Sequence, residues 1–133
     1  MEKDYISWEK FQLGISRIAQ WARDKEFDNI LGIPRGGLVV AVCMSHQLDI
    51  PLVNKIEGNT LVLDDICDSG HTLAPYHGLP TATIYYKPNE LHTPDYHAFR
   101  KHSRWIVFPF ERDETSKLDY VTKLSQFTEK QVK

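Results

Sequence analysis

The sequence has little cysteine, no excess of basic charge and no long apolar run. Its two cysteines, Cys43 and Cys67, stand 24 positions apart, a spacing that fits neither a CxxC pair nor a disulfide framework. We expect both to be reduced thiols. Lys and Arg number 16 against 18 Asp and Glu, for a net charge of −2. Proteins that bind the nucleic-acid backbone usually carry a basic excess, so nucleic acid is not an expected partner.

The apolar runs are all far shorter than the roughly 20 residues that a membrane helix needs. The first five residues, Met1 to Tyr5, also lack the apolar segment of a secretory signal. We therefore expect a cytoplasmic protein with no membrane partner. Hydrophobic residues make up 41% and charged residues 26% of the 133 positions, as in ordinary globular proteins. No linker or internal repeat divides the chain, which predicts a single domain over residues 1–133.

Hydrophobic periodicity predicts a helix over residues 7–22, with Ser7 as its N-cap. A second, buried helix is expected over residues 38–48, after an apolar strand at 29–33 and a Pro-Arg-Gly-Gly turn. Further strands are expected at 59–63, 81–86, 96–99 and 105–108, and an amphipathic helix at about 114–130. Alternating strands and helices predict an α/β fold, with a mostly parallel central sheet flanked by helices and a minimal hood.

The strongest motif runs from Leu61 to Thr72, where an apolar strand leads into Asp64 and Asp65 and then into Asp68-Ser69-Gly70-His71-Thr72. Ligands bind at the carboxyl ends of parallel strands. Adjacent carboxylates suit the two vicinal hydroxyls of a ribose, and loop N–H groups with Ser and Thr hydroxyls suit a phosphate. The alternative is an ordinary acidic loop, since these are common turn residues.

The whole twelve-residue string resembles the signature of the type I phosphoribosyltransferases, which use 5-phosphoribosyl 1-pyrophosphate. The resemblance implies that Asp64 and Asp65 hold the ribose and a Mg²⁺ ion, and that the loop 68–72 holds the 5-phosphate. Pro34-Arg35-Gly36-Gly37 resembles the pyrophosphate loop of that family, with Arg35 and Gly36 as ligand contacts. In the family this loop often contains a non-proline cis peptide, here implied between Arg35 and Gly36.

The later part of the chain resembles the base-recognition elements of the xanthine-guanine group within this family. By that resemblance Lys87 donates to the 6-oxo oxygen of a purine, Trp105 stacks on the base, and the Ile106 carbonyl meets its exocyclic group. Asp68 is the expected catalytic residue, handling the N7 proton of the base. His71 lies inside the phosphate loop, where it either contacts the phosphate or points to solvent.

The expected function is transfer of a phosphoribosyl group to a 6-oxopurine with release of pyrophosphate, in purine salvage. The resemblance implies Mg²⁺ as cofactor and a homodimer or higher homo-oligomer. Only 29 positions separate Arg35 from Asp64, so the family's flexible catalytic loop is shortened. Either another subunit or the segment around Lys55 then covers the site, or catalysis is weak. The alternative function is a nucleotide-binding or donor-binding regulatory protein with little catalysis; a pyrimidine-type transferase is disfavoured by Lys87 and Trp105.

Overall fold

The computed structural model describes residues 2–112, and its centre is a five-stranded, fully parallel sheet in the order β3-β2-β4-β5-β6. These strands are β2 (Asn29–Gly32), β3 (Leu52–Val53), β4 (Thr60–Cys67), β5 (Thr81–Tyr86) and β6 (Tyr96–Arg100). β4 and β5 have neighbours on both sides and are almost wholly buried, as expected for central strands of a parallel sheet.

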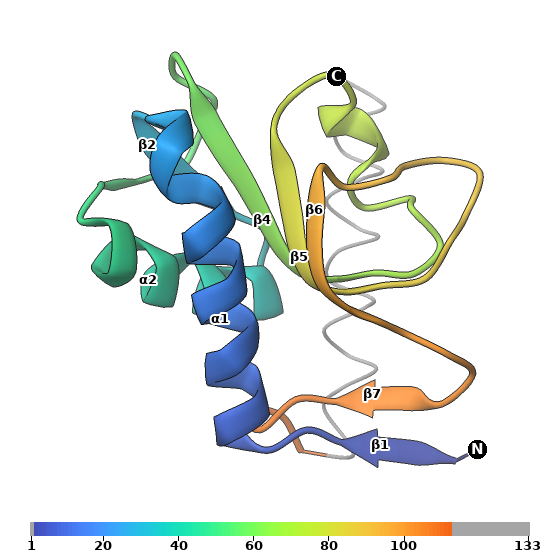
Figure 1. Cartoon of the computed structure of the whole chain (residues 1–133). Coiled ribbons are helices and arrows are strands. Elements are labelled where there is room, and N and C mark those ends of the chain that lie inside the picture. The colour runs from blue at the N-terminus through green and yellow to red at the C-terminus, as the bar shows by residue number, and fades with distance from the viewer. Residues whose placement is uncertain (1, 113–133) are drawn as a thin grey trace.

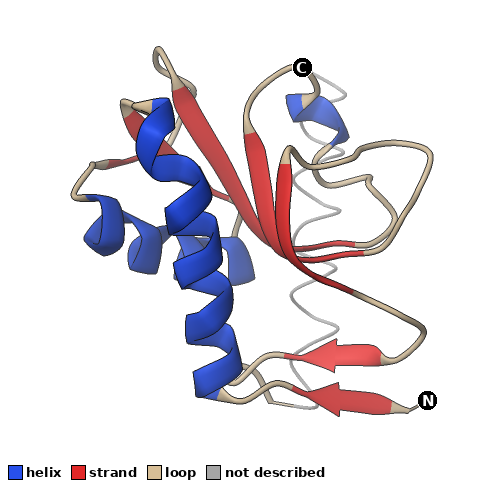
Figure 2. Ribbon diagram, in the orientation of Figure 1, coloured by secondary structure: helices blue, strands red, loops and turns tan. Residues whose placement is uncertain are grey.

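Two long helices cover one face of this sheet, α1 (Trp8–Ala22) against β5 and β6, and α2 (Gly36–Leu48) against β2 and β4 (Figure 2). The Ser7 hydroxyl caps α1 by accepting a hydrogen bond from the Lys10 N–H at 3.0 Å, as predicted. Phe11, Ile15 and Ile18 are at most 1% exposed, so the predicted apolar stripe is the buried face. Trp8 begins the same stripe but is 59% exposed, because it lies at the end of the helix beyond the sheet.

The opposite face of the sheet carries a second, smaller apolar cluster. Side chains alternate along each strand, so Leu61 and Leu63 pack under the helices while Val62 packs on the other side. There Val62 meets Leu73 and Tyr76, which belong to the loop after β4 and to the short 3₁₀ helix η2 (Ala74–Tyr76). The loop after β4 is thereby anchored to the sheet by its own apolar residues.

A small hood lies at the carboxyl end of the sheet. It is a parallel pair of β1 (Lys3–Tyr5) with β7 (Trp105–Val107), in which Lys3 is opposite Trp105. In Figure 1 this pair lies at the foot of the fan formed by β4, β5 and β6. The α/β fold with a minimal hood is as predicted.

Three details differ from the sequence-based expectations. The short strands β1 and β3 are not predicted, because neither carries a periodic apolar pattern. β4 runs on to Cys67 rather than ending at Leu63, because its backbone stays paired with β5 through Tyr86. A 3₁₀ turn, η1 (Arg23–Lys25), extends α1. After the loop 68–72 the chain forms only the single turn η2, as Pro75 predicts, because proline does not fit inside a regular helix.

The helix predicted at 114–130 lies outside the described residues. Among residues 2–112, none of the helices combines the length and apolar character needed to span a bilayer.

Candidate active site

The strand order creates a crevice at the carboxyl end of the sheet. β3 and β4 lie on opposite sides of β2, so the chain connections leave in opposite directions at this point. Ligands of open α/β sheets bind at such switch points. The turn after β2 contains Arg35, and the loop after β4 contains residues 68–72, so two of the predicted motifs lie at the same edge of the sheet.

A cavity of about 350 Å³ opens beside the loop after β4. Three parts of the chain form its wall: β4 with its following loop, the residue after β6, and the hood. Its lining residues are Asp65, Ile66, Cys67, Asp68, Ser69, Gly70, Thr72, Leu73, Lys101, Trp105, Ile106, Phe108 and Glu111. This volume is in the range of small-molecule sites, and its wall mixes an apolar hood with a polar loop.

The two acids of the motif occupy different positions. Asp65 is 1% exposed and lines the cavity, whereas Asp64 is 0% exposed and is not among the lining residues. Asp64 Oδ1 accepts a hydrogen bond from the Asp65 N–H at 2.8 Å and lies beside Gly37 of α2. A methyl group on Gly37 would stand 2.7 Å from the Leu63 carbonyl oxygen. Gly37 is thus needed for the close packing of α2 on β4, which holds Asp64 in place.

Gly70 of the phosphate-loop candidate packs against Asn89, which lies after β5. Asn89 Oδ1 accepts hydrogen bonds from the N–H groups of Leu91 at 2.9 Å and His92 at 2.8 Å. Gly70 has a φ of +86°, and any side chain there would overlap Asn89 Oδ1. Within the loop, the Ser69 hydroxyl lies 3.0 Å from Nδ1 of the exposed His71. The loop therefore has a defined shape before any ligand arrives.

The turn after β2 contains a cis peptide, but between Pro34 and Arg35 rather than between Arg35 and Gly36. The predicted position was wrong by one bond. Arg35 already has helical dihedral angles and its carbonyl accepts a hydrogen bond from the Leu38 N–H at 3.1 Å. The Arg35–Gly36 peptide therefore belongs to the entry of α2. Arg35 is exposed at this turn, and Gly36 is buried.

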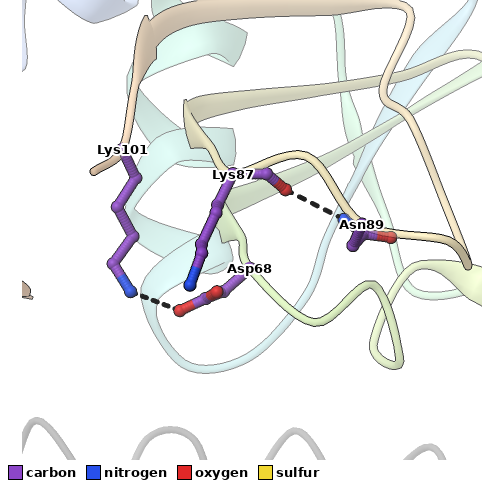
Figure 3. Close-up of polar contacts among 4 residues, drawn as sticks. All are labelled: Asp68, Lys87, Asn89 and Lys101. Atoms are coloured by element: carbon purple, nitrogen blue, oxygen red, sulfur yellow. Dashed lines mark hydrogen bonds and ion pairs between the residues drawn. The ribbon is translucent and has the colours of Figure 1, made fainter. Parts of the chain in front are cut away.

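Two lysines leave the carboxyl ends of β5 and β6 next to each other, because Tyr86 and Arg100 are register partners. Lys101 is 8% exposed, forms an ion pair with Asp68 and lines the cavity. Lys87 is exposed and is not among the lining residues. Figure 3 shows both ammonium groups extending toward Asp68, with the ion pair drawn for Lys101.

The hood supplies the apolar wall of the cavity. Trp105 is half-buried, and Ile106 and Phe108 are 7% and 2% exposed. Glu111 Oε1 accepts a hydrogen bond from the Phe108 N–H at 2.9 Å, which fixes the chain after β7. Lys55 does not line the cavity, so among the described residues it is the hood, rather than the Lys55 segment, that covers it.

One group with a shifted pKa, His92, lies outside the cavity and contacts β4 and β5. Burial lowers the pKa of His92, the positive charge of His77 lowers it further, and Asp95 partly offsets both. His92 Nε2 lies 2.8 Å from the Thr81 hydroxyl, and its carbonyl oxygen lies 3.5 Å from the Cys67 thiol. The uncharged form of His92 is thereby favoured, and the residue links β5 to the end of β4. Both cysteines are free thiols, as predicted.

Comparison with known proteins places this geometry in a family. The chain is 32% identical to a purine phosphoribosyltransferase from Pyrococcus horikoshii whose structure is solved, over 84% of this chain and 96% of that one, with a TM-score of 0.74. The chain belongs to the purine phosphoribosyltransferases. It is also 29% identical to the xanthine-guanine phosphoribosyltransferase of Cereibacter sphaeroides, over 80% of this chain and 86% of that protein.

A xanthine-guanine-hypoxanthine phosphoribosyltransferase from Helicobacter pylori shares the fold, with a TM-score of 0.67 at 19% identity over 88% of this chain and 99% of that one. No family model matches the sequence. The protein is thus an enzyme that transfers a phosphoribosyl group to a purine base, as predicted. The alternative of a binding protein with little catalysis is not favoured.

Sequence reasoning missed several residues of the phosphoribosyltransferase cavity, above all Lys101, Phe108 and Glu111. Lys101 is 33 residues from Asp68 along the chain, and no local motif contains both. The one available signal was its position directly after a strand, the same position that singled out Lys87. The strand order was needed to see that both lysines end at the same edge of the sheet.

Proposed function

We propose that this phosphoribosyltransferase acts on 6-oxopurine bases, with 5-phosphoribosyl 1-pyrophosphate as donor and pyrophosphate as the released product. The observation that carries the proposal is the composition of the 350 Å³ cavity. A loop rich in N–H and hydroxyl groups forms one wall, and an aromatic hood forms the other. A ribose phosphate needs the first wall, and a purine needs the second.

The donor would be held by the loops after β2 and β4. N–H and hydroxyl groups of Ser69, Gly70 and Thr72 would bind the 5-phosphate, with His71 at the exposed edge of the same loop. Asp64 and Asp65 would accept hydrogen bonds from the ribose hydroxyls. The proposal is supported for Asp65 by its place in the cavity wall. Arg35 and Gly36, at the start of α2, would bind the pyrophosphate, for which a guanidinium offers a planar set of donors.

The base would stack on Trp105 in the hood, and its exocyclic group would meet the Ile106 carbonyl. Lys87 would donate to the 6-oxo oxygen from the end of β5. Its ammonium is a hydrogen-bond donor only, and the 6-amino group of adenine is also a donor, so the two cannot pair. Asp68 lines the cavity, and its carboxylate would accept the N7 proton. Positioning of the two reactants would supply much of the acceleration, roughly 7–11 kcal/mol in well-oriented systems.

Mg²⁺ is proposed as the cofactor, with Asp64 and Asp65 as its protein ligands; of the two, only Asp65 lines the cavity, and Asp64 is buried next to it. Both residues provide carboxylate oxygens, the ligand type that Mg²⁺ prefers, and Mg²⁺ usually takes only one or two carboxylates together with substrate phosphates. Among residues 2–112, no group of three or more His, Cys, Asp or Glu side chains is arranged to hold a metal. The bound ion would neutralise charge on the leaving pyrophosphate.

We also propose that the chain forms a homodimer through the outer face of α2. Leu38 and Val42, one helical turn apart, are each 44% exposed, as is Leu52 of β3. Exposed apolar side chains that share one helix face, as Leu38 and Val42 do, are typical of association surfaces. Light scattering should show a dimer, and Leu38→Glu with Val42→Glu should yield a monomer; a monomeric wild type would refute the proposal.

Cytoplasmic localisation stays a prediction, supported by the two free thiols.

The test of the proposed function is product formation. The enzyme is mixed with the donor, Mg²⁺ and one of guanine, xanthine, hypoxanthine or adenine, and nucleotide is measured by chromatography. We expect the three oxopurines to react and adenine not to react. Lys87→Ala should lower activity on oxopurines and weaken the preference against adenine. Equal use of adenine and guanine by the wild type would overturn the substrate class.

A further inference from the structure

Lys101 is a buried lysine that lines the cavity. The proposed contact between the purine base and a lysine already uses Lys87, so Lys101 has no role yet. Its side chain is 7% exposed, whereas that of its partner Asp68 is 36% exposed. Its backbone N–H donates to the Tyr86 carbonyl at 2.7 Å, which fixes the root of the side chain at the sheet edge. Lysine is almost never buried without a partner, and an ion pair of this kind contributes little net stability because both charges lose water. The position therefore invites a functional explanation.

The ammonium lies over the ring on which the base is proposed to stack. Lys101 Nζ is 6.0 Å from the centroid of the Trp105 ring, and the same ammonium pairs with Asp68. A purine on the face of Trp105 with its N7 toward Asp68 would thus lie beside this cation. The Lys87 ammonium also extends toward Asp68 (Figure 3), but Lys87 is exposed and does not line the cavity.

The proton transfer in the proposed reaction moves a negative charge from Asp68 to the base. The N7–H bond breaks, an O–H bond forms on the Asp68 carboxylate, and the electron pair stays in the purine ring. The ring then bonds through N9 to C1 of the ribose, and the C1–O bond breaks with its electrons leaving on pyrophosphate. Between these events the base is an anion in a cavity with an apolar wall, where a nearby fixed cation is most effective.

We propose that Lys101 is a catalytic residue that stabilises this purine anion. Its ammonium is the counter-ion of Asp68 before proton transfer and becomes the counter-ion of the base afterwards, so the cation is paired throughout. Because it is held in place by the ion pair and by its backbone hydrogen bond to Tyr86 at the end of β5, little reorganisation is needed when the charge moves. This inference rests on the proposed function, in which Asp68 accepts the N7 proton.

The test compares the steady-state kinetics of Lys101→Met, Lys101→Arg, Asp68→Asn and the double variant Lys101→Met/Asp68→Asn. Lys101→Met keeps the length of the side chain and removes its charge. We expect kcat to fall by about 10²-fold, the usual effect of losing one preorganised stabilising group, with the KM for the donor unchanged. Lys101→Arg should recover at least a tenth of the wild-type kcat. Asp68 is partly exposed, so water can solvate it and the variant should fold; thermal unfolding checks this.

Lys25 provides a matched control. It also pairs with an acid, Asp24 at 3.5 Å, and its ammonium lies 4.8 Å from the centroid of a tryptophan ring, Trp21, but it is exposed and outside the cavity. Lys25→Met should leave kcat unchanged. A kcat for Lys101→Met within threefold of that of Lys25→Met would overturn the inference.

The double variant separates stabilisation of the base from mere positioning of Asp68. If Lys101 acts on the base, Lys101→Met lowers kcat in the Asp68→Asn background too; if it only positions Asp68, the second substitution adds nothing, and the inference is wrong. A wild-type rate for Asp68→Asn would instead refute the proposed role of Asp68. A wild type inactive on every oxopurine would refute the proposed function, so the failures are distinguishable.

Discussion

Gly70 of the phosphate loop and Gly78 beyond it form a natural pair for testing how the loop is held. Both have positive φ, +86° and +88°, so alanine meets the same backbone penalty at either position, about 1–2 kcal/mol. Their surroundings differ. A methyl group on Gly78 meets nothing within 4 Å, whereas one on Gly70 overlaps Asn89 Oδ1 and stands 2.9 Å from Leu91 Cβ. The difference between the variants therefore reports on the contacts with Asn89 and Leu91.

The magnitude follows from what Asn89 would lose. Its Oδ1 accepts two backbone N–H groups, at 2.9 and 2.8 Å, and each such hydrogen bond contributes about 0.5–1.5 kcal/mol. Moving Asn89 away from a new methyl group sacrifices both. Gly70→Ala should therefore lower the free energy of unfolding by about 1–3 kcal/mol more than Gly78→Ala does.

Urea denaturation of both variants measures this difference, and the KM for the donor reports on the loop itself. We expect that KM to rise for Gly70→Ala and to stay at the wild-type value for Gly78→Ala. Equal unfolding free energies for the two variants would show that Asn89 does not brace the loop. An unchanged donor KM in Gly70→Ala would remove the loop from the donor site.

Three further predictions address the hood, the pH dependence and the metal. Trp105→Ala should raise the KM for the base about 5–150-fold, since stacking on an aromatic ring contributes ~1–3 kcal/mol per base, and leave the KM for the donor unchanged; a change in the donor KM alone would contradict the stacking role. His92 and His97 both have a lowered pKa in the folded protein, first because they are buried and then because of a neighbouring group, His77 for His92 and Arg100 for His97. As the pH falls below about 6.5, these histidines therefore take up protons more readily in the unfolded chain than in the folded one. The free energy of unfolding should therefore be constant above about pH 7.5 and decrease from there toward about pH 5, and the decrease should be smaller in His92→Gln. Urea denaturation at several pH values measures this. A free energy of unfolding that rises on acidification would disprove the lowered pKa values. Removal of divalent cations with EDTA should abolish nucleotide formation and added Mg²⁺ should restore it, whereas full activity in EDTA would rule out the metal.

Much of this enzyme was predictable because its information is local. Apolar spacing placed both long helices, and β-branched and aromatic runs placed β5 from Thr81 to Tyr86. The motif proposed to bind the donor could also be recognised from the sequence, because the residues from Asp64 to Thr72 are contiguous in the chain. Ser7 was identified as an N-cap because capping depends on residues only three apart.

The tertiary structure decided which distant residues share the cavity. Strand order is set by packing between elements far apart in sequence, and only that order brings Lys101 to Asp68 and the hood over both. It also separates neighbours, since α2 packs on β4 through Gly37 and encloses Asp64 while Asp65 reaches the cavity. A lysine after a strand has the same local pattern whether it is exposed, like Lys87, or buried, like Lys101. Burial depends on what lies across the fold, and for Lys101 that is the Asp68 carboxylate and the Trp105 ring.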